Sequence, residues 1–477
     1  MFEQPSPVSV VRPTRRTFTT GLAATLLSLG NAAAQTAPAL PEEDGFRVLT
    51  AGPKRVKLHP DAPAEAELWA FNEAVPGPVL RARLGEEVRV RLKNRTSKPL
   101  TLHWQGVRIA NAMDGVGGLT QAPVAPGKDF DYRFTPPDAG TFIIRPLVIG
   151  ASAEPTERGL SALLVVEERE RLPADQEIAL IFDDWRLNPD GSLAPFGELL
   201  ESATTGRLGN FPAVNGKPPP LALEPAPGSR IRLRLANLCN ARSTGLRFEA
   251  LRAYVIGVDG QPTENFEPLR STLPFGPGSR YDLIFDLPAE AGVKGSVMAL
   301  IGAGLPLLTI TTAGTPASAK RPALPPIAAP PANKLLAPMI RLQDATRRDL
   351  IIAGGAKRGT GGAPVYDGDP KRIWTINGAS GEVSAKPLFS VKRSTPVSLA
   401  IRNDTPAVQP LHVHGHVFRL LHPMDDGWEP FFLDTVQVPE NRTVRIAFHA
   451  DNPGKWLIAS TVLERFDTGL WTWFEVT

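Results

Sequence analysis

Residues 85–94 read G-E-E-V-R-V-R-L-K-N, and apolar and polar side chains alternate until the segment closes at an asparagine. Alternation with a period of two is typical of a β-strand that buries one face. The pattern returns at residues 228–237 (G-S-R-I-R-L-R-L-A-N) and 394–403 (S-T-P-V-S-L-A-I-R-N). The copies lie too far apart for a solenoid and at a suitable distance for whole domains. The sequence therefore predicts an all-β protein of three Greek-key β-sandwich domains.

Turn signals support this organisation. The chain holds 49 prolines and 42 glycines, which suits strands joined by many turns. Asn215-Gly216 and Asn377-Gly378, ahead of the second and third copies, are hairpin signals. We expect three domains, at residues 45–168, 175–313 and 340–477. A Pro/Ala-rich linker at residues 314–339 is expected to join the second domain to the third.

The N-terminus carries an export signature. Arg15 and Arg16 precede a weakly apolar run and small residues, so residues 1–34 are predicted to be a twin-arginine signal peptide rather than a basic tail. We therefore expect a periplasmic protein with no membrane span in the mature chain. Acidic and basic residues nearly balance, which gives no indication of nucleic-acid binding. The single Cys239 excludes an internal disulfide and is expected to be a small buried side chain.

Three of the seven histidines lie close together, in the stretch Q-P-L-H-V-H-G-H-V-F at residues 409–418. Alternate side chains of a strand share a face, so His412 and His414 can present two imidazoles to one metal ion. The alternative is a strand end rich in histidine that has no ligand role. The stretch alone does not decide between the two interpretations.

Motifs along nearly the whole chain, in this order, resemble those of the multicopper oxidases. They are L-H-W-Q-G at residues 102–106, M-D-G at 113–115, G-T-F at 140–142, the histidine stretch, D-N-P-G-K-W at 451–456 and V-L-E-R-F-D-T-G-L at 462–470. The resemblance implies three cupredoxin domains. It also implies a type 1 copper in the third domain and a trinuclear copper cluster between the first and third domains.

Most of the ligands that the resemblance implies are replaced in this chain. The type 1 site lacks its thiolate, because Ser460 stands at the cysteine position, and of the cluster's eight imidazoles only His103, His412 and His414 remain. The substituted positions are Gln105, Arg145, Leu147, Gln409, Ala459, Ser460, Thr461, Arg465 and Leu470. We therefore expect no laccase-type four-electron oxidase activity.

The three retained histidines permit two interpretations. In the family, His103 and His412 match the ligands of the type 2 copper, and Asp114 matches a residue just outside that metal. They are expected to meet, with His414, around one copper or zinc ion, while Asp114 orients an imidazole or a water molecule. Alternatively they are hydrogen-bonded histidines at a seam between domains.

Two arginines replace family ligands and need partners if they are buried. We expect Arg145 to form an ion pair with a carboxylate such as Asp114, and Arg465 to pair near Glu464 or Asp467. The alternative is that the arginines form a pocket for a small anion.

Three functions remain open at this point. The preferred one is a non-catalytic periplasmic scaffold or binding protein with a protein partner, similar to the SufI-type cell-division protein of the same fold. The second is a copper-binding oxidoreductase with one type 2-like copper at His103, His412 and His414. The third is a binder of small ligands or anions in the vacated copper cavities.

Overall fold

The computed structural model describes residues 40–421 and 427–477, so the predicted signal peptide lies outside the described residues. Strands dominate the described chain, and its few helices are short. The prediction of an all-β fold is therefore confirmed. None of the helices in the described parts has the length and apolar character needed to cross a membrane.

Two sheets form the first part of the fold. One has the order β1-β2-β5-β7, with β3 on β2, and the other has the order β4-β9-β8-β6. Their apolar faces pack around Trp104, Phe142 and Leu92. The strands are β1 (Glu42–Glu43), β2 (Phe46–Val56), β3 (Ala66–Phe71), β4 (Val79–Arg83), β5 (Val88–Asn94), β6 (His103–Gln105), β7 (Asp129–Phe134), β8 (Gly140–Arg145) and β9 (Ala162–Glu167).

The middle part also has two sheets, with the orders β11-β10-β13-β18-β15-β16 and β12-β20-β19-β14-β17. Phe182, Leu233 and Phe285 lie in the core between them. The strands are β10 (Gln176–Trp185), β11 (Phe211–Val214), β12 (Leu221–Leu223), β13 (Arg230–Asn237), β14 (Thr244–Glu249), β15 (Tyr254–Val258), β16 (Gln261–Phe266), β17 (Thr272–Phe275), β18 (Arg280–Asp286), β19 (Lys294–Ala299) and β20 (Leu305–Thr311).

The last part pairs the sheets β24-β21-β26-β30-β28 and β25-β32-β31-β27-β29 around Trp456 and Phe474, and adds the ribbon β22-β23. Its strands are β21 (Thr346–Gly354), β22 (Lys357–Arg358), β23 (Pro364–Val365), β24 (Trp374–Ile376), β25 (Ser390–Val391), β26 (Thr395–Asn403), β27 (Gln409–Val413), β28 (Arg419–Leu420), β29 (Thr435–Val438), β30 (Thr443–Ala450), β31 (Gly454–Ser460) and β32 (Trp471–Val476).

Short helical turns connect the strands. β20 ends at Thr311 and β21 begins at Thr346, and the segment between them includes the predicted linker. The domain boundaries themselves stay a prediction. The helices are α2 (Ala153–Glu157), α3 (Leu199–Ala203), α4 (Leu463–Asp467) and the 3-10 turns η1 (Asn111–Met113), η2 (Leu269–Ser271), η3 (Ala317–Ala319), η4 (Leu342–Asp344) and η5 (Thr360–Gly362).

The three repeated segments occupy equivalent places. β5, β13 and β26 each pair in parallel with the first long strand of their part and antiparallel with a later one. Each closes at a buried asparagine, Asn94, Asn237 or Asn403. Its side-chain amide donates to backbone oxygens at 2.8–3.1 Å, and its oxygen accepts the N–H two residues further on at 2.9–3.0 Å. The asparagine thus ties each strand end to nearby loops.

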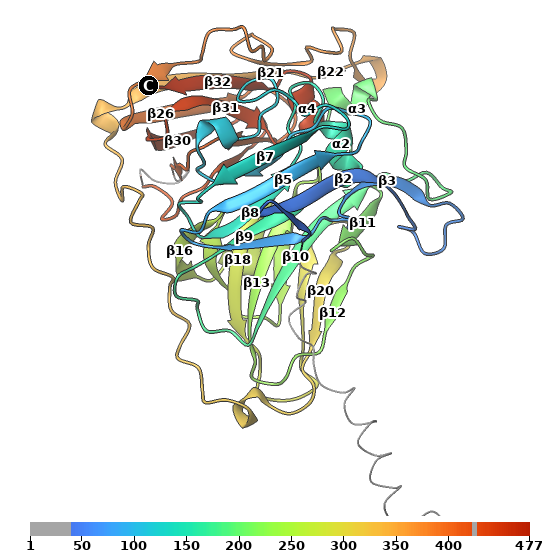
Figure 1. Ribbon diagram of the computed structural model, residues 1–477, viewed down its shortest axis with the longest axis vertical. Coiled ribbons are helices and arrows are strands. Elements are labelled where there is room, and N and C mark those ends of the chain that lie inside the picture. The colour runs from blue at the N-terminus through green and yellow to red at the C-terminus, as the bar shows by residue number, and fades with distance from the viewer. Residues whose placement is uncertain (1–39, 422–426) are drawn as a thin grey trace, which may run out of the picture. The chain divides into compact units, whose positions relative to one another are not determined.

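The first and last parts of the fold are joined by hydrogen bonds that involve backbone groups. Asn111 Nδ2 donates to the Lys455 oxygen at 2.6 Å, and Asn452 Nδ2 donates to the Ile109 oxygen at 2.8 Å. The N–H groups at the start of α2 donate to the Asp467 carboxylate of α4 at 2.8–2.9 Å. In Figure 1 the red strands β31 and β32 lie above the blue and teal strands β5 and β7. This contact brings β6 and β27 together.

Candidate metal centre

The structure brings His103, His412 and His414 into one cluster. His103 begins β6, His412 lies in β27, and His414 follows in the turn after that strand. Each imidazole offers one nitrogen that lies within 4.8 Å of the other two. The ring centroids are 4.2 Å apart for His103 and His414, 4.8 Å for His412 and His414, and 5.7 Å for His103 and His412. No more than 2 % of any of the three residues is exposed.

Backbone carbonyl groups fix the tautomers of His103 and His412. Nδ1 of His103 lies 2.8 Å from the Asp114 oxygen, and Nδ1 of His412 lies 2.9 Å from the Asp434 oxygen. A carbonyl group only accepts hydrogen bonds, so each Nδ1 carries a proton, and in the neutral imidazole each Nε2 carries the lone pair. Both Nε2 atoms are buried without a hydrogen-bond partner. Two unused lone pairs, each on an imidazole whose other nitrogen is fixed, are what a metal ion requires of its ligands.

Asp114 lies beside two of the imidazoles. Its Oδ2 accepts from Nδ1 of His414 at 3.0 Å, and its Oδ1 lies 3.4 Å from Nδ1 of His103. Burial alone would raise the pKa of Asp114, but the imidazoles of His414 and His103 outweigh that effect and hold the pKa well below its ordinary value. Burial lowers the pKa of His414 to about 3, so its imidazole is neutral at neutral pH. A neutral imidazole is the form that binds a metal.

The sequence analysis missed three residues that support this cluster. Nη1 and Nη2 of Arg280, in β18, donate to both carboxylate oxygens of Asp434. Asp259 accepts the backbone N–H groups of Asp434 and Thr435 at 3.3 and 3.2 Å. Arg280 and Asp259 belong to the middle part of the chain, where the ligand motifs gave no signal.

Arg145 does not form the expected pair. Asp114 contacts the imidazoles instead, and Arg145 donates from Nη1 to the backbone oxygen of Thr461 at 3.3 Å. The expectation of an Arg145–Asp114 ion pair is therefore wrong, because the two histidines already use that carboxylate. Gln105 donates from Nε2 to the Thr435 hydroxyl at 3.3 Å, while its Oε1 is buried without a partner.

Comparison with known proteins assigns the family. Residues 54–171 and 364–477 each match a family model described as multicopper oxidase. The multicopper oxidase MmcO of Mycobacterium tuberculosis is 31% identical over 445 residues, which cover 86% of this chain and 82% of that protein. The chain belongs to the multicopper oxidase family.

Other relatives agree with this assignment. The crystal structure of a multi-copper oxidase from Pseudomonas thermotolerans superposes with a TM-score of 0.78 at 32% identity, and covers 90% of this chain and 98% of its own. A copper resistance protein A homolog of Pseudomonas syringae pv. tomato is 32% identical over 184 residues, or 36% of this chain and 30% of that protein. Membership of the multicopper oxidases implies copper as the metal.

The residues that the family resemblance places at the type 1 position are hydrogen-bonded to one another and to the backbone. Arg465 donates from Nη1 to Gln409 Oε1 at 2.6 Å and to the Val408 oxygen at 2.7 Å, and from Nη2 to the Thr204 oxygen at 3.0 Å. The expected pairing of Arg465 with Glu464 or Asp467 is wrong, because the guanidinium donates to neutral amide and carbonyl oxygens instead. Ser460 accepts the Val462 N–H at 3.1 Å, and Leu470 lies in the apolar core.

Some residues at positions that the family resemblance assigns to the trinuclear cluster are apolar in this chain. Leu147 and Ala459 pack with Leu463, Phe466 and Trp471 in one buried group. Thr461 donates its hydroxyl to the Pro277 oxygen at 2.8 Å. The donor set therefore fits one copper ion at the three histidines. It fits neither a type 1 copper nor a trinuclear cluster.

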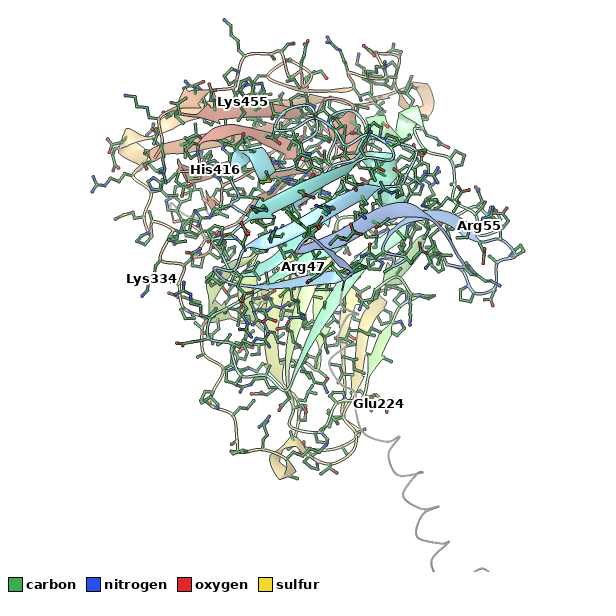
Figure 2. The ribbon with its side chains drawn as sticks, in the orientation of Figure 1. Arg47, Arg55, Glu224, Lys334, His416 and Lys455 are labelled. Carbon is green, nitrogen blue, oxygen red and sulfur yellow. The ribbon has the colours of Figure 1, made fainter. Side chains whose placement is uncertain are left out.

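His416, labelled in Figure 2, does not belong to the group of three histidines. Gly415 has a φ of +66°, which turns the chain after the strand, and His416 packs against the rings of Phe448, Trp456 and Phe474. Its Nδ1 lies 3.0 Å from the His414 oxygen. The face shared by alternate residues therefore ends at His414.

Proposed function

We propose that this multicopper oxidase family member binds one copper ion at His103, His412 and His414 and does not act as a laccase. The observation that carries the proposal is the pair of buried Nε2 atoms that have no partner, each on an imidazole whose Nδ1 is fixed by a backbone carbonyl. A structural histidine at a domain seam would be expected to use both ring nitrogens, because an unpaired buried polar atom is costly.

A bound copper ion supplies one-electron redox chemistry. The protein's own contribution is to hold three imidazoles in a site closed to bulk water, with Asp114 and the Asp434 backbone orienting them. Laccase chemistry needs a further copper that delivers electrons, and Arg465 with Gln409 occupies that position. We therefore propose a mononuclear copper protein, at most a one-electron oxidoreductase, that is exported to the periplasm.

A non-catalytic periplasmic scaffold with a protein partner is the second candidate. It is favoured by the hydrogen bonds of Arg465, which replaces a type 1 ligand, because they join the end of α3, the start of β27 and α4 without a metal. A scaffold needs such rigidity but no metal.

Metal content and paramagnetic resonance of copper-loaded protein separate the two. We expect about one copper per chain with a type 2 spectrum, as a small set of imidazole ligands predicts. The double variant His103→Ala/His412→Ala should lose this copper, whereas His59→Ala, a histidine away from the cluster, should keep it.

Equal, weak copper uptake by the native protein and the double variant would contradict the copper proposal. The scaffold would then be the better hypothesis. Its test is recovery of the same envelope protein with the native chain and with the double variant.

A further inference from the structure

Arg145 is a buried guanidinium beside the histidine cluster. It ends β8 and lies directly opposite His103 in the antiparallel pairing of β6 and β8, so the two side chains leave the sheet on one face. Only 7% of Arg145 is exposed. Within the described part of the chain, its one hydrogen bond runs from Nη1 to the Thr461 oxygen, and its buried Nε has no partner there.

No carboxylate among the described residues forms an ion pair with Arg145. Asp434 is the acidic group that influences it, but both oxygens of that carboxylate already accept from Arg280, and Oδ1 also accepts from the Thr435 hydroxyl. Burial and the nearby charge of Arg280 lower the pKa of Arg145 to about 10, so it remains protonated at neutral pH. A buried cation without a carboxylate of its own is costly, and the described residues offer Arg145 only the charge of Asp434, which Arg280 already pairs with.

Copper would add to this positive charge. The three imidazoles are uncharged ligands, so a copper(II) ion would bring its full charge into the same buried region. The polar atoms here that lack partners are of two kinds: electron-pair donors at His103 Nε2, His412 Nε2, Gln105 Oε1 and Asp114 Oδ1, and a proton donor at Arg145 Nε. The first kind suits a metal ion, and the second suits an anion.

We propose that Arg145 forms an anion-binding site at the histidine cluster, where a small monovalent anion, a halide or a short carboxylate, binds together with the copper ion. The anion accepts N–H groups from the guanidinium and gives a lone pair to the metal in exchange for water. No electron is transferred in this step. This inference rests on the proposed copper site and assigns Arg145 as the residue that selects its further ligand.

Azide titration of the copper-loaded full-length protein tests the proposal, followed by charge-transfer absorption and by the paramagnetic resonance spectrum. We expect azide to bind at least about ten-fold more weakly to Arg145→Gln than to the native protein, since hydrogen bonds to a charged group are lost. Arg145→Lys should be intermediate, because it keeps the charge without the planar fork. Arg252→Gln, which removes an exposed guanidinium paired with Glu267, should match the native protein.

Each outcome has a distinct meaning. Equal azide affinity in the native protein and Arg145→Gln, with about one copper bound in both, overturns the anion site and leaves the copper site standing. If Arg145→Gln does not fold, the titration of the native protein decides. Native spectra that stay unchanged when azide or formate is added would overturn the inference. If the native protein binds no copper, the proposed function fails and the anion inference fails with it.

Discussion

At the scale of single residues, the atoms around each histidine indicate its role better than its spacing in the sequence does. His103 and His412 each leave Nε2 without a partner, whereas His416 is enclosed by aromatic rings. The same logic separates the two arginines that replace family ligands. Arg465 has three short hydrogen bonds to oxygens, and Arg145 has a single longer one. We therefore expect Arg465 to matter for stability and Arg145 for ligand binding.

Arg465→Met should lower the free energy of unfolding by about 2–4 kcal/mol, because it leaves Gln409 Oε1 and two backbone oxygens buried without donors. Urea unfolding followed by circular dichroism measures the change. Adding Gln409→Leu should recover part of it, since one orphaned acceptor then disappears. A loss below about 0.5 kcal/mol would show that water replaces the guanidinium.

His416 should make the protein sensitive to acid. Burial lowers the pKa of His416 to about 4, while the unfolded chain has an ordinary histidine pKa near 6.5. Between these values the unfolded state binds the extra proton, so stability is lost as the pH falls, by up to about 1.4 kcal/mol per pH unit from this residue. The difference in unfolding free energy between the native protein and His416→Phe, measured from pH 7 to pH 4.5, should follow that slope.

Comparing the native protein with His416→Phe also removes contributions to stability whose pH dependence has the opposite sign. Burial raises the pKa of Asp467 to about 7, which gives stability the opposite pH dependence in both proteins. That contribution cancels in the difference. Parallel curves for the two proteins would mean that His416 does not control the acid transition.

At the scale of elements, the threefold repeat extends beyond the strands to their turns. Asn215-Gly216 and Asn377-Gly378 both adopt positive φ, as the sequence signal indicates, and Asn72-Glu73 adopts the same conformation with φ of 51° and 63°. In all three turns the asparagine amide donates to an oxygen of the first strand and its oxygen accepts an N–H of that strand. The sequence did not indicate the first turn, because Glu73 stands where the other two turns have glycine.

Glu73→Gly should stabilise the protein by about 0.5–1 kcal/mol. The left-handed conformation costs glutamate more than glycine, and this gain exceeds the greater flexibility of glycine in the unfolded chain. Thermal unfolding measures it.

Gly378→Glu is the matched control, since a Cβ there meets no atom within 4 Å and φ is +77°. It should destabilise by a similar amount. A change of the same sign in both variants would contradict the strain argument.

The elements were more predictable from the sequence than the site. Period-two alternation reports local burial, so the three strands and the all-β class follow from the sequence, and the family motifs point to His103, His412 and His414. Partners of buried charges depend on packing between distant segments. For that reason the expected pairs of Arg145 and Arg465 were wrong and Arg280 was not found.

At the scale of the whole molecule, all three parts of the chain build the site. The first supplies His103 and Asp114, the last supplies His412 and His414, and the middle part supports Asp434 through Arg280 and Asp259. Arg280 also donates from Nε to the Thr141 oxygen at 3.1 Å and from Nη1 to the Gly278 oxygen at 2.7 Å. One buried guanidinium therefore contacts every part.

Arg280→Met should lower the free energy of unfolding by about 3–5 kcal/mol, because it leaves the Asp434 carboxylate buried without its cation. It should also weaken copper binding, since the Asp434 oxygen that holds His412 is no longer fixed. Chemical unfolding and copper titration measure the two effects. Additive effects of Arg280→Met and Asp434→Asn, instead of strong coupling, would contradict this role.

The large sequence separation between the proposed ligands also affects the stability of the fold. His103 and His414, two of the proposed copper ligands, come from the first and last parts of the chain. A metal ion bound to both would act as a reversible cross-link that closes most of the polypeptide into a ring. Because the ion binds only the folded ring, a concentration one hundred times its dissociation constant would add about 2.7 kcal/mol to stability. Copper supply would then set how long the protein survives unfolding and proteolysis.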